Sequence, residues 1–156
     1  PTDLPDMLVN LFTLKKSEDN YPYIDKIFHE SAEDSQKTKL TQTDLVALYL
    51  VAKMHKRKGD YLHVYTGDDG RLIVAHYLTE DRSDNPSEVT SMTVDGGDDV
   101  DFVASGLLLY KVLNYLLLSD SDAEMWFFAP LRPVQFVQAN EDGKQSTLLL
   151  TPVRTF

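Results

Sequence analysis

The sequence of 156 residues contains no cysteine. Disulfide bonds, thiolate nucleophiles and cysteine-ligated metal centres are therefore excluded, and nothing indicates the redox compartment. Basic residues are also scarce: 15 Lys and Arg stand against 25 Asp and Glu, which gives a formal net charge of −10. Nucleic-acid backbones and anionic lipid surfaces recruit clustered basic side chains, so this balance predicts no direct binding to nucleic acid or to a membrane.

Long apolar runs are lacking as well. The longest candidate, Phe102 to Leu118, has about 17 residues where a bilayer needs about 20, and it contains Lys111 and Asn114. The N-terminus begins at Pro1 and has no charged segment followed by an apolar stretch, so we expect no signal peptide. The sequence thus predicts a cytoplasmic protein, or a virion component if its source is a phage.

Familiar catalytic motifs are missing too. There is no Gly-x-Ser-x-Gly, no phosphate-binding Gly-x-x-x-x-Gly-Lys-[Ser/Thr] and no His-Glu-x-x-His. Nucleophilic and zinc-dependent hydrolysis therefore have no support. We identify no catalytic and no metal-binding residue from the sequence.

Apolar periodicity predicts helices in the first third of the chain. The first carries Leu4 to Leu14, and the second runs from Tyr23 to about Glu33. A polar loop over residues 31–38 follows. Either Thr41 or Thr43 then caps a third helix that continues to Met54.

From residue 60 the apolar period becomes two, as in strands. The first two strands flank a glycine-containing turn, and pairing Thr66 with Arg71 places His63 and His76 on one face. We expect strands at residues 61–66, 71–78, 89–94, 124–129, 134–139 and 145–151, and a helix at residues 102–118. The prediction is one α+β domain spanning residues 1–156, with a mostly antiparallel six-stranded sheet, N-terminal helices and one long central helix.

This order of elements resembles the GNAT acetyltransferases over about 150 residues. The resemblance implies that the backbone of Met92 and Val94 would hold the pantetheine arm of acetyl-CoA. Gly96 and Gly97 would then hold its pyrophosphate. However, four aspartates lie between residues 95 and 101 in this turn, where they would repel a polyanionic cofactor.

Two further features differ from the GNAT pattern. Only Pro130 to Pro133 separate the strand at 124–129 from the last hairpin, which is too short for the helix of that family. No tyrosine follows Tyr115, so the family's usual general acid has no counterpart. We therefore expect a non-enzyme more than an N-acetyltransferase.

Three groups of side chains remain as candidates for binding. The aspartates of residues 95–101 could hold calcium, but we favour a role in capping the following helix. His63 and His76 could share a metal or form a pH-sensitive pair, but no third ligand is evident, and we favour a packed pair. Trp126 and Phe128 fit either the core or an interaction surface.

We therefore predict a non-enzymatic binding or assembly protein on a GNAT-like scaffold, with no cofactor. It would act on a protein partner or self-associate through its sheet face, its sheet edge or its acidic turn, and it suits a phage or bacterial accessory or virion component. The first alternative is an acetyl-CoA-dependent N-acetyltransferase. The second is an acidic inhibitor or DNA mimic.

Overall fold

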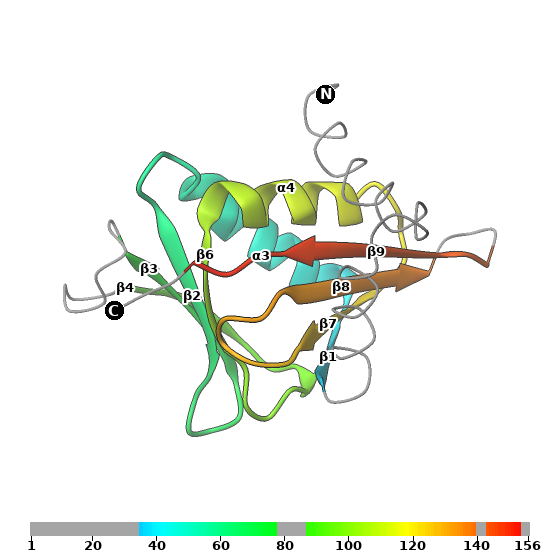
Figure 1. The fold of residues 1–156 in the computed structure, drawn as a ribbon, viewed down its shortest axis with the longest axis horizontal. Coiled ribbons are helices and arrows are strands. Elements are labelled where there is room, and N and C mark those ends of the chain that lie inside the picture. Colours follow the sequence, from blue (N-terminus) through cyan, green and yellow to red (C-terminus); the bar gives the residue numbers. More distant parts are fainter. Residues whose placement is uncertain (1–34, 78–86, 140–142, 154–156) are drawn as a thin grey trace.

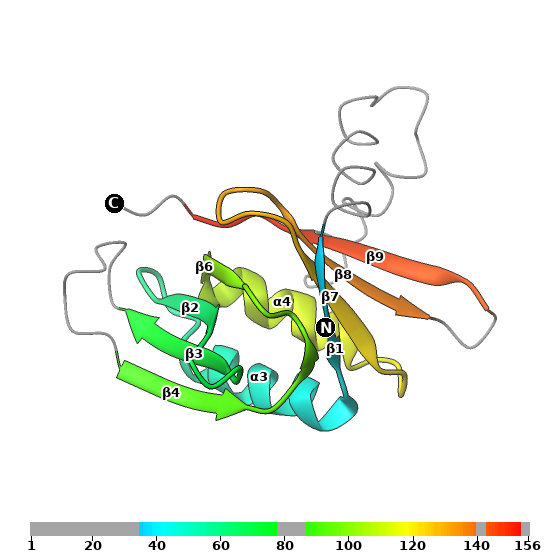
Figure 2. The same cartoon turned by 90° about the horizontal axis from the view of Figure 1, so that it is seen from below.

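The computed structural model describes residues 35–77, 87–139 and 143–153. Within these ranges the chain forms two helices and nine strands, arranged as two antiparallel sheets beside a helical layer (Figures 1 and 2). The first sheet has the strand order β5-β1-β7-β8-β9, and the second has the order β4-β3-β2-β6. The helices are α3 (Gln42–Met54) and α4 (Gly106–Leu116). The strands are β1 (Gln36–Leu40), β2 (Tyr61–Thr66), β3 (Leu72–Tyr77), β4 (Ser87–Met92), β5 (Asp95–Gly96), β6 (Asp101–Ser105), β7 (Ala123–Phe127), β8 (Val134–Ala139) and β9 (Gln145–Leu150).

The two helices pack side by side in antiparallel directions. The start of α3 lies beside the chain that leaves α4, because the side-chain amide of Gln42 donates to the carbonyl of Ser121 at 2.6 Å. At the other end, a methyl group added to Gly106, the first residue of α4, would lie 1.7 Å from the carbonyl oxygen of His55. Glycine at this position therefore allows the start of α4 to approach the end of α3.

One apolar core joins the helices to both sheets. Its largest fully buried side chains come from α3, α4 and strands of each sheet: Phe102, Phe136, Leu40, Leu45, Leu62, Leu72, Leu109, Leu113, Leu116, Met125 and Leu148. Burial of this apolar surface is the main force that holds the layers together. No helix within the described ranges is long and apolar enough to cross a membrane.

The expected single sheet of six strands is wrong. Strand β1 overlaps the segment of residues 31–38 that we expected to be a loop, and it pairs with both β5 and β7. The sequence of β1 is too polar to indicate a strand, because only Thr38 and Leu40 of its five residues are buried. The α+β class and the antiparallel pairing are confirmed.

The expected helix at residues 102–118 begins too early. Asp101–Ser105 forms β6, which pairs with β2, and Ser105 then caps α4 by accepting from the amide of Leu108. Phe102, Val103 and Ala104 are all buried, and such a continuous apolar run looks the same in a buried strand and in a buried helix. The aspartates before it therefore do not cap the helix. The helices expected at residues 4–14 and 23–33 lie outside the described residues.

Candidate functional site

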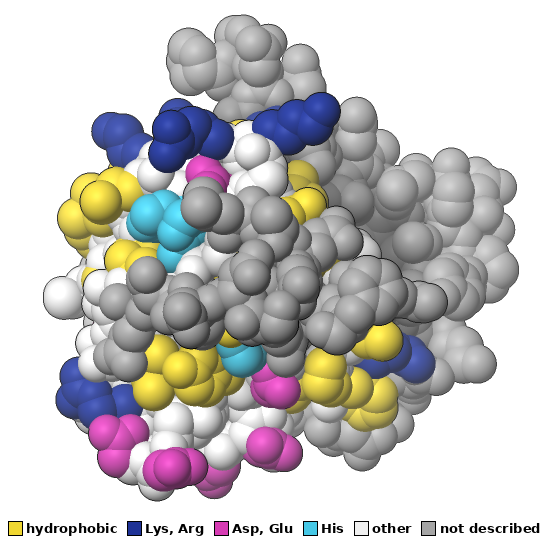
Figure 3. All heavy atoms as spheres, turned by 90° about the vertical axis from the view of Figure 1, so that its left-hand side faces the viewer, with side chains coloured by type: hydrophobic (Ala, Val, Ile, Leu, Met, Phe, Trp, Pro, Cys, Tyr) yellow, Lys and Arg dark blue, Asp and Glu magenta, His cyan; other side chains and the backbone are white. Residues whose placement is uncertain are grey.

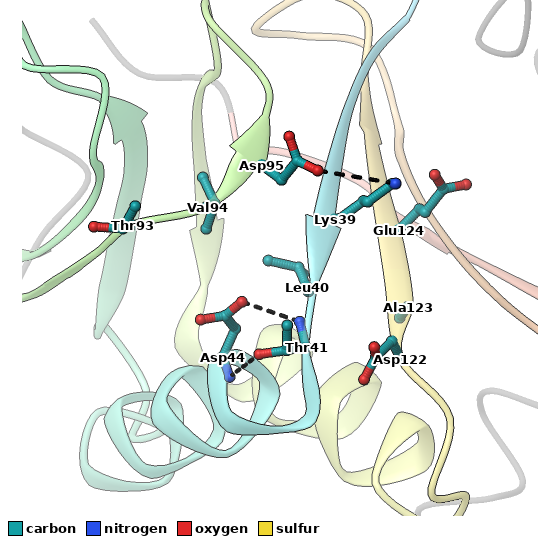
Figure 4. A pocket seen from close by; sticks show the side chains of 10 residues that line it. All are labelled: Lys39, Leu40, Thr41, Asp44, Thr93, Val94, Asp95, Asp122, Ala123 and Glu124. Atoms are coloured by element: carbon teal, nitrogen blue, oxygen red, sulfur yellow. Dashed lines mark hydrogen bonds and ion pairs between the residues drawn. The ribbon is translucent and has the colours of Figure 1, made fainter.

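A cavity of about 580 Å³ opens beside the N-terminal end of α3 (Figure 4). It lies between β1, β7 and the segment that connects β4 to β5. Its floor is apolar, since Leu40 and Ala123 are buried. The lining residues are Lys39, Leu40, Thr41, Asp44, Thr93, Val94, Asp95, Asp122, Ala123 and Glu124.

The rim of this cavity is acidic. Four of its side chains are carboxylates and one is an ammonium, that of Lys39, which lies 3.8 Å from Asp95 with both side chains exposed. Two of the carboxylates also stabilise the start of α3. Asp44 accepts from the amide of Thr41, and Asp122 accepts from the amide of Gln42, both at 3.0 Å. We call the rim residues Asp44, Asp95, Asp122 and Glu124 the acidic end of the molecule.

The opposite end of the helices is basic. The last turn of α3 and the loop after it carry four cations, which we call the basic end: Lys53, Lys56, Arg57 and Lys58. Lys56 lies over the ring of Tyr110 at 4.5 Å, so it joins the loop after α3 to α4. Figure 3 shows Lys and Arg side chains along the upper rim of this side of the molecule, above a group of histidines. The net charge of −10 therefore hides a separation of charge along the helices.

Between these ends, α3 exposes an apolar stripe. Val46, Leu50 and Met54 are exposed by 44%, 52% and 68%, and their spacing of four residues places them on one face of the helix. Isolated apolar side chains at a surface are ordinary, but three in a row on one helix favour contact with another protein.

A second polar cluster lies at the basic end and joins three parts of the chain. His55 is at the C-terminal cap of α3, Asp60 precedes β2 and His76 is in β3. His76 Nε2 lies 2.9 Å from Asp60 Oδ1, and the His55 and His76 rings are stacked with their centroids 3.9 Å apart. The Asp60 side chain is 3% exposed.

The electrostatics of this cluster favour an ionised Asp60 and a neutral His55. Burial raises the pKa of the Asp60 carboxyl, but hydrogen bonds from His76 and from the amide of Arg57 outweigh it and hold the pKa below its usual value. Burial, and after it the charge of His76, lowers the pKa of His55. His55 Nδ1 is buried and has no hydrogen-bond partner.

The histidines that we expected on one face lie on opposite faces. His63 pairs with Ala75 and His76 pairs with Leu62, so the register differs by one residue from the expected one. The connection spans five residues, because Thr66 pairs with Leu72. A shift of one residue moves a side chain to the other face. His63 instead lies 2.6 Å from Asp101 and stacks on Tyr65. No pattern in the sequence indicated that His76 would lie beside Asp60 and His55.

The glycines of the acidic turn pack against β1. Gly96 pairs with Thr38, and both Gly96 and Gly97 have positive φ angles, of 90° and 69°. An added methyl group would lie 2.2 Å from the carbonyl of Lys37 at Gly96, and 1.8 Å from Thr38 Oγ1 at Gly97. These close contacts explain the glycines without a ligand. Of the other two residues proposed for acetyl-CoA, Val94 lines the cavity and Met92 is in the core.

Trp126 and Phe128 are both half-buried at and just beyond the end of β7. Trp126 Nε1 donates to Glu124 at 3.3 Å, and Lys37 lies over its ring at 4.5 Å. Arg132 lies over the ring of Phe128 at 5.3 Å. Each aromatic ring thus has a cationic neighbour, and a role in binding stays a prediction for both.

Solved structures similar to this chain include a bacterial DNA polymerase β subunit and two DNA polymerase sliding clamps. The DNA polymerase β subunit of Streptococcus pyogenes matches 79% of this chain with a TM-score of 0.59 and 16% identity, and the match covers 32% of that subunit. The DNA polymerase sliding clamp of Caulobacter crescentus matches 79% with a TM-score of 0.59 and 15% identity, and the match covers 31% of the clamp. The sliding clamp of Bacillus subtilis matches 80% with a TM-score of 0.54 and 12% identity, covering 32% of that clamp. The chain thus spans about a third of the length of these proteins.

No family model and no curated protein sequence matches the chain. At the identities just given, the similarity to the clamps establishes the fold alone. It corrects the expected GNAT scaffold and the acetyltransferase resemblance. The order of elements expected along the chain is similar to that of the GNAT proteins, but the strands form two sheets and not one. Strands β1 and β5 belong to the first sheet, and β6 belongs to the second.

Proposed function

We propose that this protein is a non-enzymatic assembly protein whose copies associate head to tail, the acidic end of one copy against the basic end of the next. The observation that carries the proposal is the fold, which is that of a unit within DNA polymerase sliding clamps. About two-thirds of each clamp chain lies outside the matched part. In those chains the matched part lies beside further protein, and we propose that copies of this chain lie beside one another in a comparable way.

The distribution of charge supports the head-to-tail arrangement. Asp44 is in the first turn of α3, whereas Lys53 is in its last turn. A helix of 13 residues is about 20 Å long, roughly twice the Debye length at physiological salt, so the two ends act as separate charged surfaces. Association of two different surfaces is heterologous, and it continues until a ring closes or a filament forms. Such an assembly suits an accessory or virion component, and we propose that it needs no organic cofactor.

Sedimentation velocity of the full chain over a range of concentrations tests this proposal. We expect oligomers at low salt that dissociate as salt is raised, because the contact is electrostatic. Reversing charge at the basic end, with Arg57→Glu and Lys58→Glu, should abolish them. Reversal at the acidic end, with Asp95→Lys and Glu124→Lys, should do the same.

Mixing the two reversed variants provides the decisive measurement. The reversed basic end of one variant then faces the reversed acidic end of the other, so hetero-oligomers should form although neither variant associates alone. Asp68→Lys with Asp69→Lys is the matched control, because these exposed residues lie in the β2–β3 turn and belong neither to the lining of the cavity nor to the basic end. A chain that stays monomeric at every salt and concentration would contradict the proposal.

Nucleic acid is a second candidate partner. The expectation that the protein does not contact it was based on net charge, and the basic end shows that four cations are gathered in one place. The apolar stripe of Val46, Leu50 and Met54 favours protein over a phosphate backbone. Fluorescence anisotropy with duplex DNA distinguishes the two, since binding that is lost in the Arg57→Glu, Lys58→Glu variant would favour nucleic acid. Action as an acidic inhibitor stays a prediction.

A further inference from the structure

We propose that His55, Asp60 and His76 bind a divalent transition metal, with Zn²⁺ as the best fit, and that the bound ion ties the end of α3 to β3. One ligand atom from each residue lies within 4.8 Å of the other two. These residues form the one group in the described part of the chain with such an arrangement. This assignment departs from the sequence-based expectation of no metal, which considered the pair of His63 and His76.

The ligand types select the class of ion. Two imidazoles and one carboxylate are typical ligands for zinc. Other first-row divalent metals also bind imidazole and carboxylate, but this ligand set is less characteristic of them. Calcium and magnesium prefer oxygen ligands throughout, so they do not fit a set with two nitrogens. Three protein ligands leave the fourth tetrahedral position for water or for a group from another molecule.

The unpartnered nitrogen of His55 is an independent observation. Its Nδ1 atom is buried and neither donates nor accepts a hydrogen bond. A buried polar atom without a partner is uncommon and requires an explanation, such as an ion. Neutral imidazole is the form that binds metals.

Asp60 is already oriented as a ligand. Its Oδ2 accepts from the amide of Arg57 at 2.9 Å, which leaves Oδ1 directed at His76. The Asp60 backbone is held as well, since its amide donates to Arg57 and its carbonyl accepts from Gly106 at 3.1 Å. Hydrogen bonds to the second oxygen of a ligating carboxylate fix its direction and are a usual part of metal sites.

Binding requires only local movement. Two ligand atoms on a tetrahedral zinc ion are about 3.3 Å apart, so the 2.9 Å between His76 and Asp60 would open slightly as the ion replaces their hydrogen bond. The ring of His55 must turn, because it is stacked on His76 with 27° between the planes. His55 is half-buried and lies just beyond the last turn of α3. Its Nδ1 atom has no hydrogen-bond partner, so the rotation breaks no hydrogen bond at that atom.

Titration calorimetry of the chelator-treated full chain with zinc chloride tests the site. We expect one ion per chain. The His55→Ala variant should weaken binding by about 10- to 100-fold or more, since even the loss of an outer hydrogen-bond partner has an effect of that size. His55→Ala is the preferred variant, because it leaves the buried pair of Asp60 and His76 in place and should still fold.

The His63→Ala variant is the matched control. His63 also pairs with a carboxylate, that of Asp101, but it lies on the other face of the sheet and should not affect zinc binding. Cobalt gives a second readout: tetrahedral Co²⁺ absorbs visible light, and this absorption should appear with the unaltered chain and be lost with His55→Ala. Absence of zinc binding, or equal affinity of the unaltered chain and the His55→Ala variant, would overturn the proposal.

Discussion

His76 Nε2 lies 2.9 Å from Asp60 Oδ1, and this contact joins the middle of one sheet to the loop that follows α3. The carboxylate is almost fully buried, so it depends on His76 and on the amide of Arg57 for its hydrogen bonds. A buried carboxylate is tolerated only when it is paired in this way.

Replacing His76 by alanine should destabilise the protein by about 2–3 kcal/mol, because a hydrogen bond to a buried charged group is lost. The comparison is His63→Ala, whose partner Asp101 has a side chain that is 46% exposed and can be solvated instead. Urea unfolding of both variants in the presence of a chelator gives the two free energies. Equal losses would show that the burial of Asp60 has no energetic effect.

Stability should fall as the pH is lowered below about 6.5, the ordinary pKa of histidine. The pKa of His55 is lower in the folded protein, so the unfolded chain takes up the proton first as the pH falls. The folded state therefore loses stability between the ordinary pKa of histidine and the lower pKa of His55 in the folded protein. His55→Asn should flatten this part of the profile. Urea unfolding at pH 7.5 and pH 5.5, with chelator, measures it, and identical slopes for the two proteins would contradict the assignment.

A methyl group at Gly97 should destabilise the protein far more than one at Gly70. Both residues have positive φ angles, so each alanine substitution costs about 1 kcal/mol in backbone strain. Only at Gly97 does the added carbon meet Thr38 Oγ1, at 1.8 Å, whereas nothing lies within 4 Å at Gly70. Thermal unfolding of Gly97→Ala and Gly70→Ala separates the steric effect from the strain. Similar melting temperatures would mean that the turn can move away from β1.

Thr41→Ala should cost about 1 kcal/mol, because Thr41 and Asp44 form a reciprocal capping box at the start of α3. Thr43→Ala is the control, since Thr43 is an exposed residue inside the first turn. Urea unfolding compares the two variants. A larger loss of stability for Thr43→Ala than for Thr41→Ala would mean that Thr43, and not Thr41, caps the helix.

Titration with acetyl-CoA should give no heat of binding at low salt. The carboxylates of the turn repel a polyanion, and Gly96 and Gly97 already approach β1. Micromolar affinity would contradict the proposal that the protein works without an organic cofactor. A repeat with calcium tests whether the aspartates of residues 95–101 bind that ion.

Local patterns were sufficient for several elements. The alternation of apolar residues predicted β2, β3, β8 and β9 to within one residue at each end. The capping threonines and apolar spacing predicted α3. These elements follow from the sequence because turn residues, caps and apolar periodicity act over a few neighbouring positions.

Tertiary structure decided the rest. Strand β1 is too short and polar to be recognised without its partners β5 and β7, and the apolar run of β6 became a strand because β2 lies beside it. The five-residue connection between β2 and β3 set the register, which separated His63 from His76. The sequence by itself thus determined the composition, the absence of cysteine chemistry and most local elements. Only the packing of distant segments brought His55, Asp60 and His76 together and gathered the four carboxylates of the acidic end around one cavity. Side chains far apart along the chain acquire fixed neighbours only when the sheets and helices share one core.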